Sequence, residues 1–112
     1  MKLKSRVTDG VLVLEVKGKV MGGPDAAAFQ DVVKSEIGNG HKQFVFDLGG
    51  VDWMNSSGLG ILIGGLTTIK NAGGQLKLAN VTEKIQSLFM ITKLVTIFDS
   101  HKTVEDALKA YQ

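Results

Sequence analysis

The sequence predicts an α/β domain whose mixed, mostly parallel β-sheet opens with an antiparallel hairpin and carries about four helices. Two observations predict this fold class. Strand patterns and helical patterns alternate after the first pair of strands, which is typical of parallel strands joined by helices. The 112 residues suffice for one hydrophobic core and are too few for two. We therefore expect a single domain over residues 1–112.

The first predicted elements are two strands and a helix. Strands are expected at residues 2–8 and 11–18, because the Asp9-Gly10 pair between them favours the tight turn of a hairpin. Gly22-Gly23-Pro24-Asp25 ends the strand pattern, and proline suits the first turn of a helix. That helix should end at Gly38-Asn39-Gly40. Its buried stripe is expected to comprise Ala26, Phe29, Val32, Val33 and Ile37.

The middle of the chain predicts a buried strand followed by a glycine-rich helix. Residues 44–48 are nearly all apolar, as expected of a central strand that is covered on both faces. Residues 56–71 carry apolar side chains at helical spacing, and Ala72-Gly73-Gly74 should end this second helix. Another strand is expected around Leu76 and Leu78, with its exit at Val81.

The C-terminal part predicts two more helices and an edge strand. Residues 85–89 mark a third helix, and residues 95–98 predict a short edge strand. A last helix is expected after Ser100, because Thr103 and Asp106 have the spacing of a capping box at a helix start.

Composition and charge exclude several classes of protein. The absence of cysteine excludes disulfide scaffolds, thiolate metal sites and thiol nucleophiles. The 13 basic and 11 acidic residues are interspersed, so nucleic-acid binding has little electrostatic support. No apolar signal-peptide core follows the N-terminus, and the longest apolar stretch, residues 59–66, is too short for insertion across a membrane. We expect a cytoplasmic protein.

Two adjacent serines, Ser56 and Ser57, mark the candidate site. They follow the central strand and a short loop, and they stand where the second helix is expected to begin. Free backbone N–H groups and the helix dipole favour negative charge at such a place. A serine there either caps the helix or accepts a phosphate, and the residues by themselves leave both roles open.

Glycines in the second helix also have two explanations. Gly58, Gly60 and Gly64-Gly65 each cost roughly 1 kcal/mol of helix propensity relative to alanine, so several on one helix require a reason. Either they let the helix lie close to the sheet, or they let a partner surface approach its backbone.

Other candidate sites are weaker. The helix glycines miss the dinucleotide-binding spacing by one residue, and no Gly-Lys-Ser/Thr phosphate loop exists. His41 and His101 stand alone beside lysines and are expected on the surface. Asp47 and Asp52 have no histidine or cysteine nearby in sequence, so we interpret them as acceptors that order the loop or contact a partner. Trp53 is expected in the core. We predict no catalytic residue, no metal site and no cofactor.

The stretch Asp-Leu-Gly-Gly-Val-Asp-Trp-Met-Asn-Ser-Ser-Gly-Leu-Gly-Ile-Leu, residues 47–62, resembles the signature of the STAS domain found in bacterial anti-sigma factor antagonists. The order of elements resembles that family from end to end. The resemblance implies a cytoplasmic switch protein that is not an enzyme. Unphosphorylated, such a protein binds an anti-sigma factor that is also a serine kinase, which frees the sigma factor. The kinase phosphorylates a loop serine and breaks the complex, and a PP2C-type phosphatase restores it.

The resemblance also implies roles for the residues around the serines. Ser57, immediately before a glycine, corresponds to the phosphoacceptor. Loop support would come from Ser56, Asn55 and Gly58, with Ser56 as a candidate helix cap. The partner-binding surface would comprise Met21, Gly22, Gly23, Met54, Gly60 and Gly64. Met54 beside the serines and Met21 from the other loop would form an adaptable apolar surface if both are exposed.

Two positions depart from the family pattern. The family usually has Asp before the serine pair, where this chain has Asn55. It also tends to have Gly-x-Leu-Asp after the second strand, where this chain has Gly18-Lys19-Val20-Met21. Ser57 therefore lies in a less negative setting, which should ease addition of a phosphate.

Two alternatives to this function stay open. The first is a STAS module of another system, such as a stress-signalling scaffold or a membrane-transport complex, that binds a different partner with the same surface. The second is a small enzyme or nucleotide-binding protein that uses the glycine-rich loop.

Overall fold

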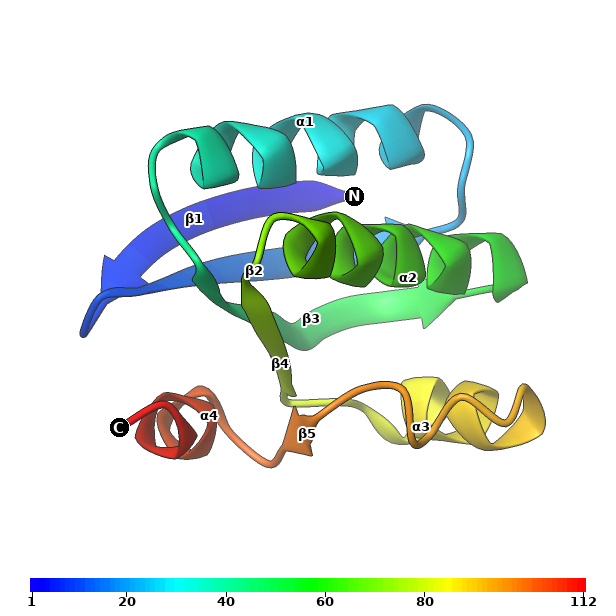
Figure 1. The fold of residues 1–112 in the computed structure, drawn as a ribbon. Coiled ribbons are helices and arrows are strands. Elements are labelled where there is room, and N and C mark those ends of the chain that lie inside the picture. The colour runs from blue at the N-terminus through cyan, green and yellow to red at the C-terminus, as the bar shows by residue number, and fades with distance from the viewer.

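The computed structural model describes residues 1–112 as five strands and four helices around one mixed sheet (Figure 1). The strands lie in the order β1-β2-β3-β4-β5. Only β1 and β2 are antiparallel, and each later strand runs parallel to its neighbour. The elements are β1 (Lys2–Thr8), β2 (Val11–Val20), α1 (Pro24–Gly38), β3 (Gln43–Met54), α2 (Ser56–Asn71), β4 (Gln75–Ala79), α3 (Glu83–Ile91), β5 (Ser100–His101) and α4 (Val104–Ala110). The predicted α/β fold with an opening hairpin is confirmed.

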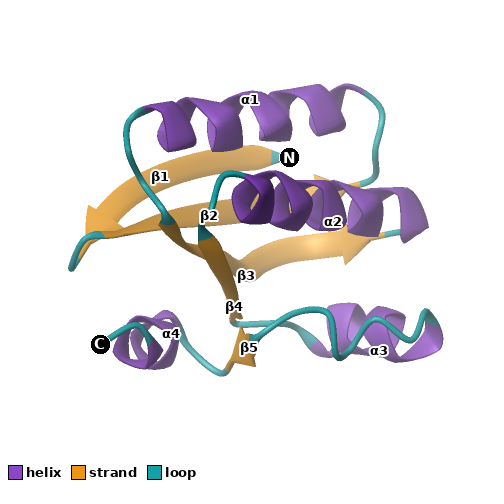
Figure 2. Cartoon of the chain, in the orientation of Figure 1, coloured by secondary structure: helices purple, strands orange, loops and turns teal.

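Helices cover both faces of the sheet, as Figure 2 shows, with α1 and α2 on one side and α3 and α4 on the other. The main core contains 21 buried residues, and Phe29 of α1 packs edge-on against Phe46 of β3 within it. A smaller core of five residues lies on the other face, under α4. No helix is both long and apolar enough to span a bilayer.

Local sequence signals account for several element boundaries. Asp9 and Gly10 both have positive φ angles, 53° and 78°, which is the turn that a tight hairpin requires. Helix α1 starts at Pro24 as predicted, and α2 spans the predicted residues 56–71. Helix α4 starts behind Thr103, whose side chain accepts a hydrogen bond from the Asp106 N–H.

The central strand is longer than its apolar run predicts. Strand β3 continues past Leu48 to Met54, so the residues expected to form a loop before the serines pair with the end of β2 instead. Two register shifts, each with one extra residue in β3, accommodate this extension. The result is that Val20 and Met54 pair side by side at the end of the two strands.

The predicted edge strand at residues 95–98 is wrong, because the edge strand is Ser100–His101. Residues after α3 form turns with local hydrogen bonds, including Leu94 N–H to the Phe89 carbonyl at 2.8 Å. Lys93 has a φ of 60°, which breaks any extended run at this point. The apolar side chains in the segment serve packing instead, since Phe98 stacks on Phe89 in the main core. The strand predicted around Leu76 and Leu78 is β4, which ends at Ala79; Asn80, with a positive φ of 56°, begins the exit that was expected at Val81.

Candidate functional site

The candidate site lies where β2 and β3 end beside each other. The chain leaves β2 through residues 21–23 into α1, and it leaves β3 through Asn55 into α2. Because Val20 and Met54 are paired, the two exits lie next to each other. Gly22 marks the contact between them: a Cβ at position 22 would lie only 2.9 Å from the Cβ of Ser57. The family resemblance implies that this loop lies near the serines, and Gly22 does lie beside Ser57.

Asn55 caps α2. Its backbone is extended, and its side-chain Oδ1 accepts a hydrogen bond from the Gly58 N–H at 2.8 Å. Ser56 and Ser57 are therefore the first two residues inside the helix, and both are exposed. The suggestion that Ser56 caps the helix is wrong, because the preceding amide occupies that position. Since Asn55 caps, Ser57 has no capping role, and this exposed residue lies at the positive end of the helix dipole.

Gly58 is required by packing within the chain. A Cβ at this position would lie 1.8 Å from the carbonyl oxygen of Val20, so the helix backbone rests directly on the end of β2. This contact fixes the start of α2 against the sheet and holds the serines in place. The expected support role of Gly58 thus has a steric basis.

The other helix glycines divide between the two explanations. Cβ atoms at Gly64 and Gly65 would crowd α1, 2.9 Å from Gln30 Nε2 and 2.8 Å from Phe29 Cε1 respectively. Gln30 is held there by a 3.0 Å hydrogen bond from Thr68. Gly60 differs, because it is exposed and no atom lies within 4 Å of its Cβ position. Close helix packing explains Gly64, whereas Gly60 leaves bare backbone open to solvent.

Trp53, which was expected in the core, is exposed, and Met54, whose exposure the proposed apolar surface required, is buried. Met54 is only 8% exposed and belongs to the main core, whereas Trp53 is 48% exposed. The prediction of a buried Trp53 is wrong because β3 continues through both residues, and neighbours in a strand point to opposite faces. Met54 therefore offers little surface to a partner. Met21, at 46% exposed, does.

Sequence reasoning missed a groove beside the site. It has a volume of about 310 Å³ and is lined by Trp53 and Met54 at the end of β3 and by α3 residues that include Lys84 and Ile91. The Lys84 Nζ lies 5.7 Å from the centre of the Trp53 ring, which allows a cation–π contact. Ile91 is 78% exposed. In the sequence, Ile91 lies outside the apolar stripe of Ile85 and Phe89, and this position was the signal that could have indicated an exposed apolar side chain here.

The two aspartates and the two histidines that the sequence singled out lie in different parts of the fold. Asp47 accepts hydrogen bonds from Asn80 Nδ2 at 2.9 Å and from the Gly49 N–H at 3.1 Å, so its expected role as an ordering acceptor is confirmed. Asp52 is exposed. His41 precedes β3, at the strand end opposite to the serines, and His101 lies in β5 with Nε2 3.1 Å from Asp99 Oδ1. No hydrogen bond joins any of the four side chains to Ser57.

Comparison with known proteins shows a consistent relationship. The model of the STAS domain family matches residues 2–107. "Putative anti-sigma factor antagonist BtrV" of Bordetella bronchiseptica is 25% identical over 112 residues, 100% of this chain and 96% of that protein. The anti-sigma-B factor antagonist of Bacillus subtilis is 45% identical over 49 residues, which cover 44% of this chain and 45% of that protein.

Solved structures share the fold. A "putative anti-sigma factor antagonist" from Thermotoga maritima superposes with a TM-score of 0.85 at 23% identity, covering 96% of this chain and 92% of that one. The Bacillus cell fate determinant SpoIIAA in its phosphorylated form superposes with a TM-score of 0.73 at 18% identity, covering 99% and 100% of the two chains.

Proposed function

The chain belongs to the STAS domain family, and on this premise we propose that it is a cytoplasmic anti-sigma factor antagonist controlled by phosphorylation of Ser57. Unphosphorylated, the protein binds an anti-sigma factor that is also a serine kinase, and the sigma factor is released. The kinase phosphorylates Ser57 and ends the complex, and a PP2C-type phosphatase restores the binding form. The names of the two relatives and the phosphorylated state of SpoIIAA support this proposal.

The observation that carries the proposal is the position of Ser57. The residue is exposed in the first turn of α2, and the adjacent cap is supplied by Asn55. A phosphate on this residue would carry about −1.5 to −2 charges at a helix end where the dipole favours negative charge. The helix therefore tolerates the modification, and the charge acts on whatever binds there.

The proposed partner surface, named here the switch surface, comprises Met21, Gly22, Gly23, Ser57 and Gly60. Gly22 contacts Ser57 directly, and Gly60 follows one helical turn later with open space above it. A partner can thus approach the backbone of both segments at once. A phosphate in the middle of this surface would bring an unpaired charge and extra volume into the interface, and desolvating that charge is costly.

The test begins with a pull-down from extracts of the native cell, with the unphosphorylated protein as bait. We expect recovery of a serine kinase with anti-sigma activity. Recovery of a transport protein or a signalling scaffold in its place would assign the chain to another STAS system.

The recovered kinase then identifies the modified residue. With ATP it should add one phosphate, and phosphopeptide mass spectrometry should locate that phosphate on Ser57. Ser56→Ala is the matched control and should be phosphorylated normally, whereas Ser57→Ala should not. A phosphate that persists in Ser57→Ala would refute the assignment.

A further inference from the structure

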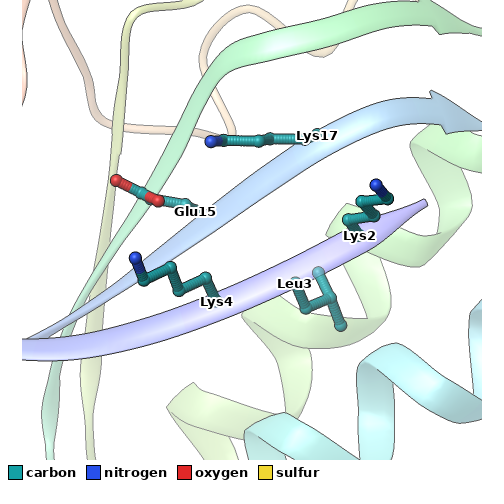
Figure 3. A pocket seen from close by; sticks show the side chains of 5 residues that line it. All are labelled: Lys2, Leu3, Lys4, Glu15 and Lys17. Carbon is teal, nitrogen blue, oxygen red and sulfur yellow. The ribbon is translucent and has the colours of Figure 1, made fainter.

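One face of the β1–β2 hairpin is exposed at the end away from its turn, where Lys2, Lys4 and Lys17 lie. In the register of this pair, Lys2 stands opposite Lys17 and Lys4 opposite Glu15, so these four side chains share a face (Figure 3). Leu3 points the other way and packs on the main core (Figure 3). Helix α4 covers the other end of this face, where Val11 and Val13 are buried against Ala107, and α3 contacts β3. The charged side chains surround an open hollow of about 310 Å³.

The lysines on this face lack acidic partners. Glu15 pairs with Arg6 at 2.6 Å, and none of the ion pairs in the chain includes Lys2, Lys4 or Lys17. Like charges placed directly opposite each other in a sheet are destabilising, yet Lys2 and Lys17 occupy such positions. We refer to Lys2, Lys4 and Lys17 as the basic face.

The excess positive charge of the protein is concentrated in this hairpin. Residues 1–20 contain five basic and two acidic residues, a net charge of +3, whereas the whole chain carries +2. Residues 21–112 therefore carry a net charge of −1. The net positive charge of the chain therefore comes from the hairpin, while the rest of the chain is close to neutral.

Protection of an exposed sheet edge does not explain the basic face. Lysines on an edge strand prevent two copies from pairing, and this accounts for Lys2 and Lys4 on β1. Lys17, however, lies on β2, which is paired on both sides. Its side chain also has a prepared position: a Cβ at Gly50 of β3 would lie 2.7 Å from Lys17 Cγ, so the glycine makes room for the lysine stem.

We propose that the basic face binds an acidic segment of a partner protein in an extended conformation. Alternate residues of a strand lie about 6.6–6.8 Å apart, so carboxylates on alternate residues of an extended peptide match the spacing of Lys2 and Lys4 along β1. Three ammonium groups beside the Arg6–Glu15 ion pair are too few for the basic clusters that hold anionic membranes or for the stripe that tracks a nucleic acid. This surface lies on the face of the sheet opposite to α2 and Ser57, and it goes beyond the proposed function.

The proposal is tested with the full chain and a synthetic peptide of about ten residues that alternates glutamate and threonine. The triple variant Lys2→Gln, Lys4→Gln, Lys17→Gln removes the basic face. Its control, Lys34→Gln, Lys70→Gln, Lys102→Gln, makes the same change in net charge at exposed lysines elsewhere. Calorimetry at low salt should show binding about tenfold weaker for the first variant and nearly unchanged for the control, with the difference lost at about 0.3 M salt. Melting of both variants checks the fold, and removing the Lys2–Lys17 repulsion should not lower the melting temperature.

Other outcomes overturn the proposal. Equal weakening in both triple variants would show attraction by net charge alone. Binding to vesicles of phosphatidylserine, lost in the first variant and without any binding of the peptide, would assign the face to a lipid surface. Unchanged peptide binding in both variants would place the peptide elsewhere on the protein.

Discussion

Gly22 approaches Ser57 so closely that a Cβ on residue 22 would lie 2.9 Å from the Ser57 Cβ, well inside ordinary contact distance. Gly22 also has a φ of 92°, which side chains other than glycine rarely adopt. The loop after β2 and the start of α2 are therefore joined through a residue that has no side chain. Because of this contact, we expect that the effect of a substitution at Gly22 on stability depends on the residue at position 57.

Gly22→Ala should destabilise the protein by about 1–3 kcal/mol, through backbone strain and the contact with Ser57. Combining it with Ser57→Gly removes the second cause but not the first. A double-mutant cycle in urea should therefore show that Gly22→Ala costs less when residue 57 is glycine. Strictly additive free energies of unfolding would mean that the loop moves away from the helix without cost.

Asn55→Ala should lower the free energy of unfolding by about 1 kcal/mol, because the Gly58 N–H loses its acceptor. Ser56→Ala is the control and should change it by less than about 0.5 kcal/mol, since Ser56 is exposed inside the first turn. Urea denaturation compares the two variants. A larger loss for Ser56→Ala would return the capping role to that residue.

Gly58→Ala and Gly60→Ala should have opposite effects on stability, although both positions lie in the same helix. At position 58 the new Cβ meets the Val20 carbonyl oxygen at 1.8 Å, so we expect a loss of about 3 kcal/mol or failure to fold. At position 60 no atom lies within 4 Å, and alanine should stabilise the helix by up to about 1 kcal/mol. Thermal melting measures both. Destabilisation by Gly60→Ala would mean that the helix needs glycine there for a reason other than partner access.

Ser57→Asp should leave the fold intact and weaken partner binding. The new carboxylate lies in the first turn of α2, where the helix dipole favours it, so the melting temperature should stay close to that of the parent. Ser57→Ala should retain binding, while Ser57→Asp should lose up to about 3 kcal/mol, because an unpaired charge is buried in the interface. If Ser57→Asp abolishes the melting transition, the switch acts by unfolding the loop and helix instead.

Tyr111 should make stability depend on pH in the alkaline range. Burial raises the pKa of Tyr111 from 10.0 to about 12, and its hydroxyl donates a 2.8 Å hydrogen bond to the Phe44 carbonyl. A raised folded-state pKa contributes stability that is complete below pH 10 and is lost as the pH rises towards about 12. Tyr111→Phe should cost about 1 kcal/mol at neutral pH and should remove this part of the alkaline loss. Urea unfolding of both proteins at about pH 8 and at about pH 11.5 measures the difference. Parallel losses in the two proteins would assign the alkaline effect to other groups.

The sequence by itself determined the α/β class, the opening hairpin and the bounds of α2. These features depend on signals that act over a few residues. Asp-Gly adopts the positive φ angles of a tight turn, and apolar residues at helical spacing give one buried stripe regardless of what they pack against. The position of Ser57 at a helix start follows from the same local signals.

Only the tertiary structure decided the details of the site. Strand β3 continues past its apolar run because β2 supplies a partner as far as Val20, and the register of that pairing turns Met54 inward and Trp53 outward. The short edge strand likewise lies at Ser100–His101 because β4 pairs there and not along the more apolar residues 95–98. Strand pairing joins residues distant in sequence, so neither its extent nor the face that each side chain occupies is encoded by neighbouring residues alone. The close approach of Gly22 to Ser57 is a consequence of that pairing, and no local pattern in the sequence contains it.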